Sequence, residues 1–287
     1  MLLFVFISHF LVIFMIPKSP QFAELAGIIM GDGSIGIYSS LVYGKVKTQY
    51  RIKVTLNSIK DLVYSKYVSD LLLSIFGKSP RIYFRKKENT LDICLFGKVF
   101  VELLISEGFS LSPKWSRSII PNSLLSPSLG LFVLRGYMDT DGCVCRVKNN
   151  GKLYPRIELK ICPSPMQNQL ISLMRLYGFT PQVSLLDRGK VRVTLAGFKN
   201  LTKWFSVVGS SNPRNLEVAR FFYLLIFRVL LLQQIQLTNI LLLFQLHSQL
   251  KISTRAFLQL LLKFLQYQKS GLVLLIGLLL QKYHIWK

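Results

Sequence analysis

The chain has 287 residues, and its 36 lysines and arginines against 13 aspartates and glutamates give a formal net charge of +23. A hydrophobic content of 51% excludes disordered and collagen-like classes, while the charge indicates a polyanionic partner, either nucleic acid or an anionic membrane surface. Four cysteines fit reduced thiols better than a disulfide framework, and their spacing matches no zinc site. They are Cys94, Cys143, Cys145 and Cys162.

The acidic residues are confined to the middle of the chain. Between Glu24 and Glu217 lie all 13 acidic residues and 27 basic ones, a net charge of +14. Residues 1–16 form an uncharged apolar run, and residues 218–287 contain eight basic residues, no acidic residue and several leucine-rich runs. Only the middle therefore has the composition of an ordinary globular protein.

The two ends have two competing interpretations. An apolar extension over 1–21 and an apolar, basic tail over 211–287 would arise from an upstream exon, an early start codon or a reading frame shifted near residue 220. Alternatively, the ends contact or span a membrane, although no apolar run reaches the ~18 residues that a spanning helix needs. We favour the first interpretation and keep membrane contact as the alternative.

The first repeat, residues 22–109, predicts helix, two strands, helix, two strands, helix. In chain order we expect a helix ending near Asp32, strands over 35–43 and 48–56, a helix over 59–76, strands over 80–87 and 91–96, and a helix over 98–107. Gly77 and Pro80 provide the stop signal for the middle helix.

The second repeat, residues 130–210, predicts the same order after a Ser/Pro-rich linker over 110–129. Its expected elements are a helix over 130–140, strands over 143–148 and 154–161, a helix over 166–177, strands over 181–187 and 190–196, and a helix over 199–208. The fold class is therefore α+β, with tandem αββαββα units related by a pseudo-twofold axis and built on antiparallel sheets.

Matching landmarks support an internal duplication. Gly31-Asp32-Gly33 corresponds to Thr140-Asp141-Gly142, and Leu95-Phe96-Gly97 corresponds to Leu195-Ala196-Gly197. The interval between them is too long for a solenoid repeat, so the chain carries two similar domains.

Basic residues alternate along the predicted strands and would share one face of each sheet. Such a basic face can lie in the major groove of double-stranded DNA, although solvated strand faces are the plainer alternative. The residues that we assign to DNA are Arg51, Lys53, Arg81, Arg85, Arg156, Lys160, Arg188, Lys190 and Arg192.

Asp32 and Asp141 each end an apolar helix and precede a glycine, which permits an abrupt exit from the helix. One such Asp would be read as a turn or cap, but two at the same place in two repeats favour a shared site. Small residues at four-residue spacing would let the two helices pack closely and bring the carboxylates together: Gly27, Gly31, Gly136 and Thr140. Paired carboxylates beside a phosphodiester bind divalent cations, which activate water and stabilise the leaving oxygen.

The first of these helices, Leu25-Ala26-Gly27-Ile28-Ile29-Met30-Gly31-Asp32-Gly33, resembles the signature of the LAGLIDADG homing endonucleases. Leu134-Arg135-Gly136-Tyr137-Met138-Asp139-Thr140-Asp141-Gly142 resembles its second copy. The resemblance covers about residues 22–210 and matches the single-chain, two-motif members of the family.

This resemblance implies sequence-specific cleavage of both strands of a long DNA site by a monomer with internal pseudo-twofold symmetry. It implies that Asp32 and Asp141 are catalytic and hold Mg²⁺ or Mn²⁺, with Gly31 and Thr140 also at the metal. Asp139, the other acid of the second motif, would be structural.

Family members often place a polar or basic residue near the end of the second strand of each unit, where this chain has Asn57 and Cys162. Among nearby lysines we take Lys98 as the third catalytic residue. The others considered are Lys53, Lys160 and Lys199.

The family also contains RNA maturases, so an intron RNA partner and a role in splicing are the alternative, as is an inactive copy. We expect no small-molecule substrate. The absence of self-splicing blocks favours a free-standing or intron-encoded protein rather than an intein. The candidate locations are the cytoplasm or nucleoid of a prokaryote and an organelle matrix.

Overall fold

The computed structural model describes residues 18–227 together with Gln234, Leu242 and Gln259. The chain divides into two compact units after Phe222, and the elements named below all belong to the first unit. Within the described part of the chain, no helix is long and apolar enough to cross a bilayer. Most of the predicted extension and tail lies outside the described residues.

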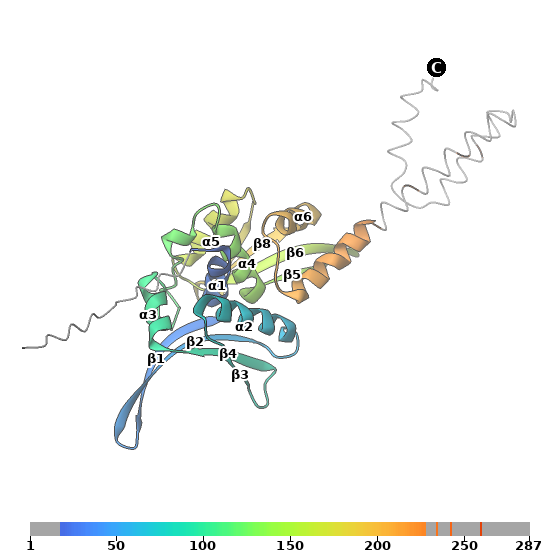
Figure 1. Ribbon diagram of the computed structural model, residues 1–287. Coiled ribbons are helices and arrows are strands. Elements are labelled where there is room, and N and C mark those ends of the chain that lie inside the picture. Colours follow the sequence, from blue (N-terminus) through green and yellow to red (C-terminus); the bar gives the residue numbers. More distant parts are fainter. Residues whose placement is uncertain (1–17, 228–233, 235–241, 243–258, 260–287) are drawn as a thin grey trace, which may run out of the picture. The chain divides into compact units, whose positions relative to one another are not determined.

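The first repeat has the predicted order of elements (Figure 1). They are α1 (Pro20–Met30), β1 (Gly33–Val42), β2 (Lys45–Asn57), α2 (Leu62–Phe76), β3 (Arg81–Phe84), β4 (Thr90–Phe96) and α3 (Lys98–Ser106). Ser19 caps α1 by accepting a hydrogen bond from the Phe22 amide at 3.2 Å, with Pro20 next to it in the first turn. Gly77 ends α2 in the left-handed conformation, with φ of 66°.

The second repeat follows the same plan. Its elements are α4 (Gly130–Asp141), β5 (Gly142–Asn149), β6 (Lys152–Ile161), α5 (Met166–Leu176), β7 (Gln182–Leu185), β8 (Val191–Ala196) and α6 (Phe198–Val207). Short 3₁₀ turns lie at Asn122–Leu124 and Asp187–Gly189. The tandem αββαββα fold predicted from the sequence is confirmed.

Each repeat contains one four-stranded antiparallel sheet. The strand orders are β1-β2-β4-β3 and β5-β6-β8-β7, so the two sheets are connected identically. One face of each sheet is buried under the helices because strand side chains alternate. The buried residues at matching positions are Ile52, Val54, Ile93 and Leu95 in the first sheet and Ile157, Leu159, Val193 and Leu195 in the second.

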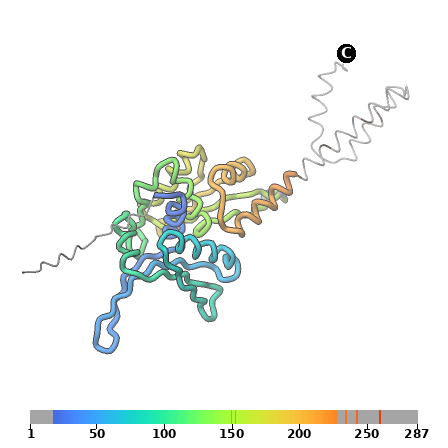
Figure 2. Tube along the Cα trace, in the orientation of Figure 1, coloured from blue at the N-terminus to red at the C-terminus, as the bar shows by residue number. Residues whose placement is uncertain are grey.

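Helices α1 and α4 pack against each other at the centre of the molecule, between the two repeats. Figure 2 shows the first repeat in blue to teal and the second in green to orange on either side of this contact. The same figures show the β1–β2 hairpin projecting beyond the rest of its sheet.

Two predicted strands are shorter than expected. The strand predicted over 80–87 ends at Phe84, and the one predicted over 181–187 ends at Leu185. In both hairpins the chain then turns through a non-glycine residue with positive φ, Lys87 at 65° and Arg188 at 57°. Such turns are short-range features that alternation of charge does not reveal.

Residues 210–215 pack on the second motif helix although the sequence analysis groups 211–287 as a tail. Asn212 and Asn215 are fully buried, and residues 213–222 continue as a helix in which Phe222 is also buried. The boundary between folded core and tail could not be predicted from composition, because the sequence is apolar on both sides of it beyond residue 217.

Candidate active site

The backbones of α1 and α4 touch at two glycines. A Cβ added at Gly27 would overlap the carbonyl oxygen of Val133, and one added at Gly136 would overlap the carbonyl oxygen of Glu24. Near the ends of the helices, a Cβ at Gly31 would overlap the Thr140 hydroxyl. All four small residues singled out in the sequence therefore lie in this helix contact.

This contact brings Asp32 and Asp141 together. Asp141 is the last residue of α4, and Asp32 lies in the turn between α1 and β1. Both side chains are exposed on one side, yet the protein around them removes part of their hydration. This desolvation raises the pKa of Asp32 to about 7, with a further increase from the negative charge of Asp141. Desolvation also raises the pKa of Asp141.

Lys114, in the predicted linker, lies near the same carboxylates, and its positive charge interacts with both of them. Its Nζ donates hydrogen bonds to the carbonyls of Ile29 at 3.0 Å and Met30 at 2.8 Å, and also to that of Gly31. These carbonyls end α1, so the ammonium group caps the helix where cations are favoured. Desolvation lowers the pKa of Lys114, and this is opposed by Asp141 and other negative neighbours.

The linker is thus an ordered part of the site. The Ser112 amide donates to the Ile35 carbonyl at 2.8 Å, and the Ser116 amide donates to the Pro163 carbonyl at 2.7 Å. The first bond joins the linker to the first repeat, and the second bond joins it to the second repeat. Lys114 lies between these two attachment points.

Arg214 occupies the corresponding position in the second repeat. In the second repeat, the segment Asn212-Pro213-Arg214 comes after α6. It lies as many residues after Gly197 as Ser112-Pro113-Lys114 lies after Gly97 in the first repeat. Arg214 Nη1 lies 3.4 Å from Asp61 Oδ1, and its positive charge, like that of Lys114, lowers the pKa of Asp32. Neither cation is among the site residues predicted from the sequence, although the repeated proline–basic pair, Pro113-Lys114 and Pro213-Arg214, is visible there.

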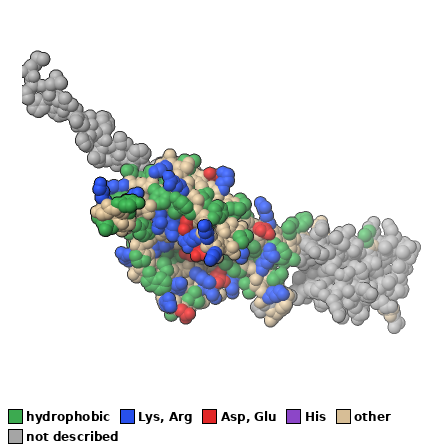
Figure 3. Space-filling model, turned by 90° about the horizontal axis from the view of Figure 1, so that it is seen from below, with side chains coloured by type: hydrophobic (Ala, Val, Ile, Leu, Met, Phe, Trp, Pro, Cys, Tyr) green, Lys and Arg blue, Asp and Glu red, His purple; other side chains and the backbone are tan. Residues whose placement is uncertain are grey.

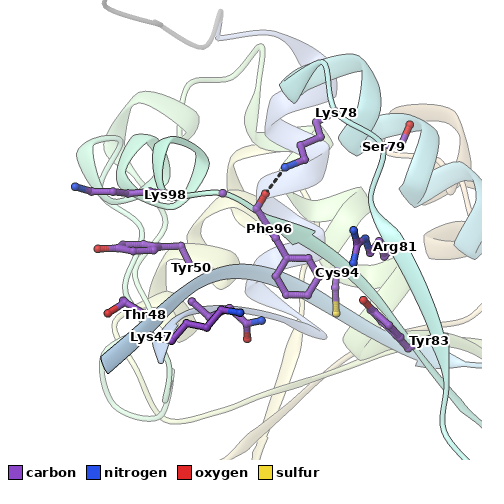
Figure 4. Close-up of a pocket in the computed structure, with 12 residues that line it drawn as sticks. Lys47, Thr48, Tyr50, Lys78, Ser79, Arg81, Tyr83, Cys94, Phe96 and Lys98 are labelled. Carbon is purple, nitrogen blue, oxygen red and sulfur yellow. Dashed lines mark hydrogen bonds between the residues drawn. The ribbon is translucent and has the colours of Figure 1, made fainter. Parts of the chain in front are cut away.

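Lys98 lies elsewhere. Its side chain is 63% exposed at the start of α3 and pairs with Glu102 at 3.6 Å. It lines an open hollow of about 600 Å³ at one end of the first sheet, together with Lys47, Lys78 and Arg81 (Figure 4). The structure thus places Lys114 beside the carboxylates and Lys98 at this hollow.

The two other predicted metal ligands are already engaged. The Gly31 carbonyl accepts a hydrogen bond from Lys114. The Thr140 hydroxyl turns back into α4 and donates to the carbonyls of Gly136 at 3.0 Å and Tyr137 at 3.1 Å. In the described part of the chain, no group of three or more His, Cys, Asp or Glu side chains is arranged to hold a metal.

Asp139 is buried and hydrogen-bonded to the segment after α6. Its carboxylate accepts bonds from the amides of Ser211 at 2.6 Å and Asn212 at 3.2 Å, from the Asn215 side chain at 3.0 Å and from the Ser210 hydroxyl. Burial raises its pKa to about 6, although these hydrogen bonds oppose the increase. Asp139 therefore ties α4 to residues 210–215.

The basic residues of the first sheet share its outer face. Arg51 lies 4.7 Å above the Tyr38 ring and leaves its buried Nε without a hydrogen-bond partner among the described residues. Lys53 and Arg85 both approach Asp92, at 3.8 Å and 2.9 Å. Figure 3 shows many Lys and Arg side chains and few acidic ones on the face it presents.

The second sheet carries a similar basic outer face, in which one acidic residue pairs with two arginines. Glu158 of β6 forms ion pairs with two arginines. Arg156 Nη2 lies 2.8 Å from one carboxylate oxygen, and Arg192 Nε lies 2.9 Å from the other. Lys160 is exposed, and Lys190 lies 5.5 Å from the Trp115 ring. Arg188 sits in the turn after β7.

No protein-family model matches the sequence, and no curated protein matches it. Solved structures do match. The meganuclease I-SmaMI, crystallised bound to uncleavable DNA, has a TM-score of 0.50 and 13% identity, covering 69% of this chain and 86% of that one. The chain has the fold of the LAGLIDADG homing endonucleases. The LAGLIDADG homing endonuclease I-LtrWI, bound to target DNA, also has a TM-score of 0.50, with 11% identity over 73% of this chain and 92% of that one.

The LAGLIDADG fold predicted from the two motif copies is thereby confirmed. At this level of identity the similarity concerns the arrangement of the backbone alone.

Proposed function

We propose that the chain is a site-specific DNA endonuclease that hydrolyses phosphodiester bonds in both strands of a duplex with the help of a divalent cation. The observation that carries this proposal is the pair of carboxylates, Asp32 and Asp141, at the joined ends of α1 and α4 between two sheets with basic outer faces. The DNA bound to I-SmaMI and I-LtrWI in their crystals supports the same function.

The residues present suit Mg²⁺ or Mn²⁺. Mg²⁺ commonly takes one or two carboxylates and keeps several waters and substrate phosphate oxygens as its other ligands, so a carboxylate pair is a sufficient protein contribution. Mutual repulsion and desolvation raise the pKa of Asp32, and a cation between the carboxylates would relieve both effects. When bound, the cation would activate water and stabilise the leaving oxygen.

We assign Lys114 rather than Lys98 to the chemistry. Its three backbone acceptors fix the ammonium group near both carboxylates, where it can offer positive charge to a phosphate. Arg214 offers a second cation from the pseudo-symmetric side, with its Nε buried and without a hydrogen-bond partner in the described residues. The catalytic role predicted for Lys98 from the sequence is untested, and our proposal does not include it.

The two sheets provide the surface for the duplex. Their pseudo-twofold relation lets one chain contact both halves of a long site, so the protein would act as a monomer. Arg51, Lys53 and Arg81 of the first sheet would meet one half, and Arg156, Lys160 and Arg192 of the second sheet the other. Cleavage at a locus lacking its intron or host element would promote the mobility of that element.

The purified full-length chain tests this proposal on linear DNA from its own locus with the inserted element removed. We expect cleavage only with Mg²⁺ or Mn²⁺, and its loss in Asp32→Asn and in Asp141→Asn. Asp70→Asn, an exposed acid of α2, is the matched control and should cut normally.

Unchanged cleavage by both active-site variants would overturn the assignment of the carboxylates. Failure of the wild-type chain to bind or cut the DNA would overturn the endonuclease proposal. Splicing of a host intron that still depends on the protein after both substitutions would instead favour the maturase alternative.

A further inference from the structure

Cys143 and Cys145 lie side by side on β5. Strand side chains alternate, so both point to the outer face of the sheet while Val144 between them is 6% exposed and faces the core. Their Sγ atoms are 3.2 Å apart, and both residues are half-buried rather than enclosed. The other two cysteines, Cys94 and Cys162, have no such partner among the described residues.

The position of β5 makes bond formation between these sulfurs feasible. A disulfide needs Cα atoms about 4.4–6.8 Å apart, and residues two apart on a strand are separated by about 6.6 Å. β5 is at the edge of its sheet, and its strand partner in the described structure is β6. A local bend that brings the sulfurs into bonding distance therefore disturbs one strand pair only.

The surroundings favour one sulfur as the nucleophile. Cys145 lies opposite Arg156, and Cys143 lies opposite Glu158, in the β5–β6 register. The hydrogen bond between the two sulfurs lowers the pKa of Cys145, and the positive charges of Arg156 and Arg192 act in the same direction, against burial and Glu158. The thiolate form is the one that attacks peroxides and disulfides.

We propose that Cys143 and Cys145 form a dithiol site that hydroperoxides oxidise reversibly to a disulfide. The Cys145 thiolate attacks one oxygen of hydrogen peroxide, the O–O bond breaks, and hydroxide leaves while Cys145 becomes a sulfenic acid. The Cys143 sulfur then attacks the Cys145 sulfur, the S–O bond breaks, and the hydroxyl group leaves as water with the thiol proton. Two thiols are oxidised to one disulfide, and one peroxide is reduced to two water molecules, the released hydroxide taking up a proton.

The site adjoins the proposed nuclease but does not depend on it. Gly142 alone separates Cys143 from Asp141, and the Val144 amide donates to Asn215 Oδ1 at 3.2 Å. The oxidation is a property of the two cysteines and is measured without DNA, so its outcome and that of the endonuclease test are independent.

Mass spectrometry of the full-length protein tests the proposal directly. Trypsin cleaves after Arg135 and Arg146, and the intervening peptide carries both cysteines. After hydrogen peroxide treatment of the folded protein and alkylation with N-ethylmaleimide, we expect this peptide to lose two hydrogens and to carry no alkyl group. Dithiothreitol should restore two alkylation sites.

Matched variants separate a disulfide from simple oxidation. In Cys143→Ser, Cys145 has no partner, so we expect added oxygen on the peptide and no loss of hydrogens. Cys94→Ser changes a buried thiol of the other sheet and should leave the disulfide unaffected. Circular dichroism confirms that each protein is folded before treatment.

Two outcomes would overturn the proposal. In one, a peroxide treatment oxidises Cys145 in Cys143→Ser, but both cysteines of the folded wild-type protein are still fully alkylated after the same treatment. The other is separate addition of oxygen to the two sulfurs without an S–S bond.

Discussion

Lys114 and Arg214 lie at equivalent positions of the two repeats, and the positive charge of each lowers the pKa of Asp32. Each follows a proline shortly after the closing helix of its repeat. Their roles differ in detail, because Lys114 binds the end of α1 whereas Arg214 pairs with Asp61. The site is therefore symmetric in charge but not in contacts.

Removing the charge of Lys114 should change the pH dependence of cleavage. Lys114 lowers the pKa of Asp32, so in Lys114→Met the pKa of Asp32 should rise, and a higher pH would be needed to ionise it. We expect the acidic limb of the pH–rate profile, measured under single-turnover conditions, to move to higher pH with a reduced maximum rate.

Lys114→Arg, which keeps the charge, should restore most of the wild-type profile, and Lys98→Met should resemble wild type. An acidic limb that stays in place in Lys114→Met would contradict the role of this lysine.

Neutralising Asp32 should stabilise the fold near and above neutral pH. The pKa of Asp32 is raised in the folded state, so protonation of this carboxyl stabilises the fold. This stabilisation is complete below pH ~4 and is lost as the pH rises to about 7. In Asp32→Asn the penalty for ionisation is absent. The melting temperature of the variant should exceed that of wild type at pH 8 by more than it does at pH 4, measured without divalent cations.

A side chain at the helix contact should destabilise the protein. In Gly136→Ala the added Cβ overlaps the Glu24 carbonyl, which belongs to a backbone that cannot move without separating the two helices. Such overpacking costs about 1–3 kcal/mol in the free energy of unfolding. Urea denaturation measures this loss, and Ser172→Ala at an exposed position of α5 should change stability little. Equal stabilities of Gly136→Ala and wild type would refute the close contact.

Asp139 should be needed for folding rather than for chemistry. In Asp139→Ala the buried donors of Ser211, Asn212 and Asn215 lose their acceptor, at a cost on the order of 3 kcal/mol. The expected result is a lower denaturation midpoint with residual Mg²⁺-dependent cleavage at low temperature. Asp187→Ala, in an exposed turn, is the control, and an unchanged midpoint in Asp139→Ala would disprove the structural role.

The first sheet should contribute to DNA affinity through charge. Replacing Arg51 by Ala removes one cation from the outer face, and each lost phosphate contact reduces the slope of log K against log salt by about 0.9. Filter binding of the catalytically inactive Asp32→Asn protein, with and without Arg51→Ala, measures this slope. Lys66→Ala, on the exposed side of α2, should leave it unaltered, and the same slope for all three proteins would argue against this face.

The order of helices and strands could be predicted because it depends on short-range patterns. Alternation in β2, the stop at Gly77 and the repeated Asp-Gly ends of the motif helices are all local features. The approach of Asp32 to Asp141 followed from small residues at helical spacing, since only they let two helix backbones touch.

The remaining site residues depend on contacts between distant segments. Lys114 reaches carbonyls about eighty-five residues earlier in the chain, and Asn212 donates to Asp61 across the two repeats. A Ser/Pro-rich stretch has the composition of a linker whether or not it crosses an active site. Its place in the sequence favours Lys98 as a site residue, but on α3 its side chain is largely exposed to solvent.

The anchoring of α4 by residues 210–215 has a consequence for biosynthesis. During translation, Asp32 and Asp141 leave the ribosome well before Asn212 and Asn215. Asn215 binds the Asp139 side chain, and Asn212 binds the Asp139 carbonyl and reaches across to Asp61. A nascent chain that stops short of them has its carboxylates but lacks both Arg214 and the polar bridge between the repeats. The proposed cleavage would therefore require synthesis of residues 210–215, which follow the last strand and helix of the second repeat.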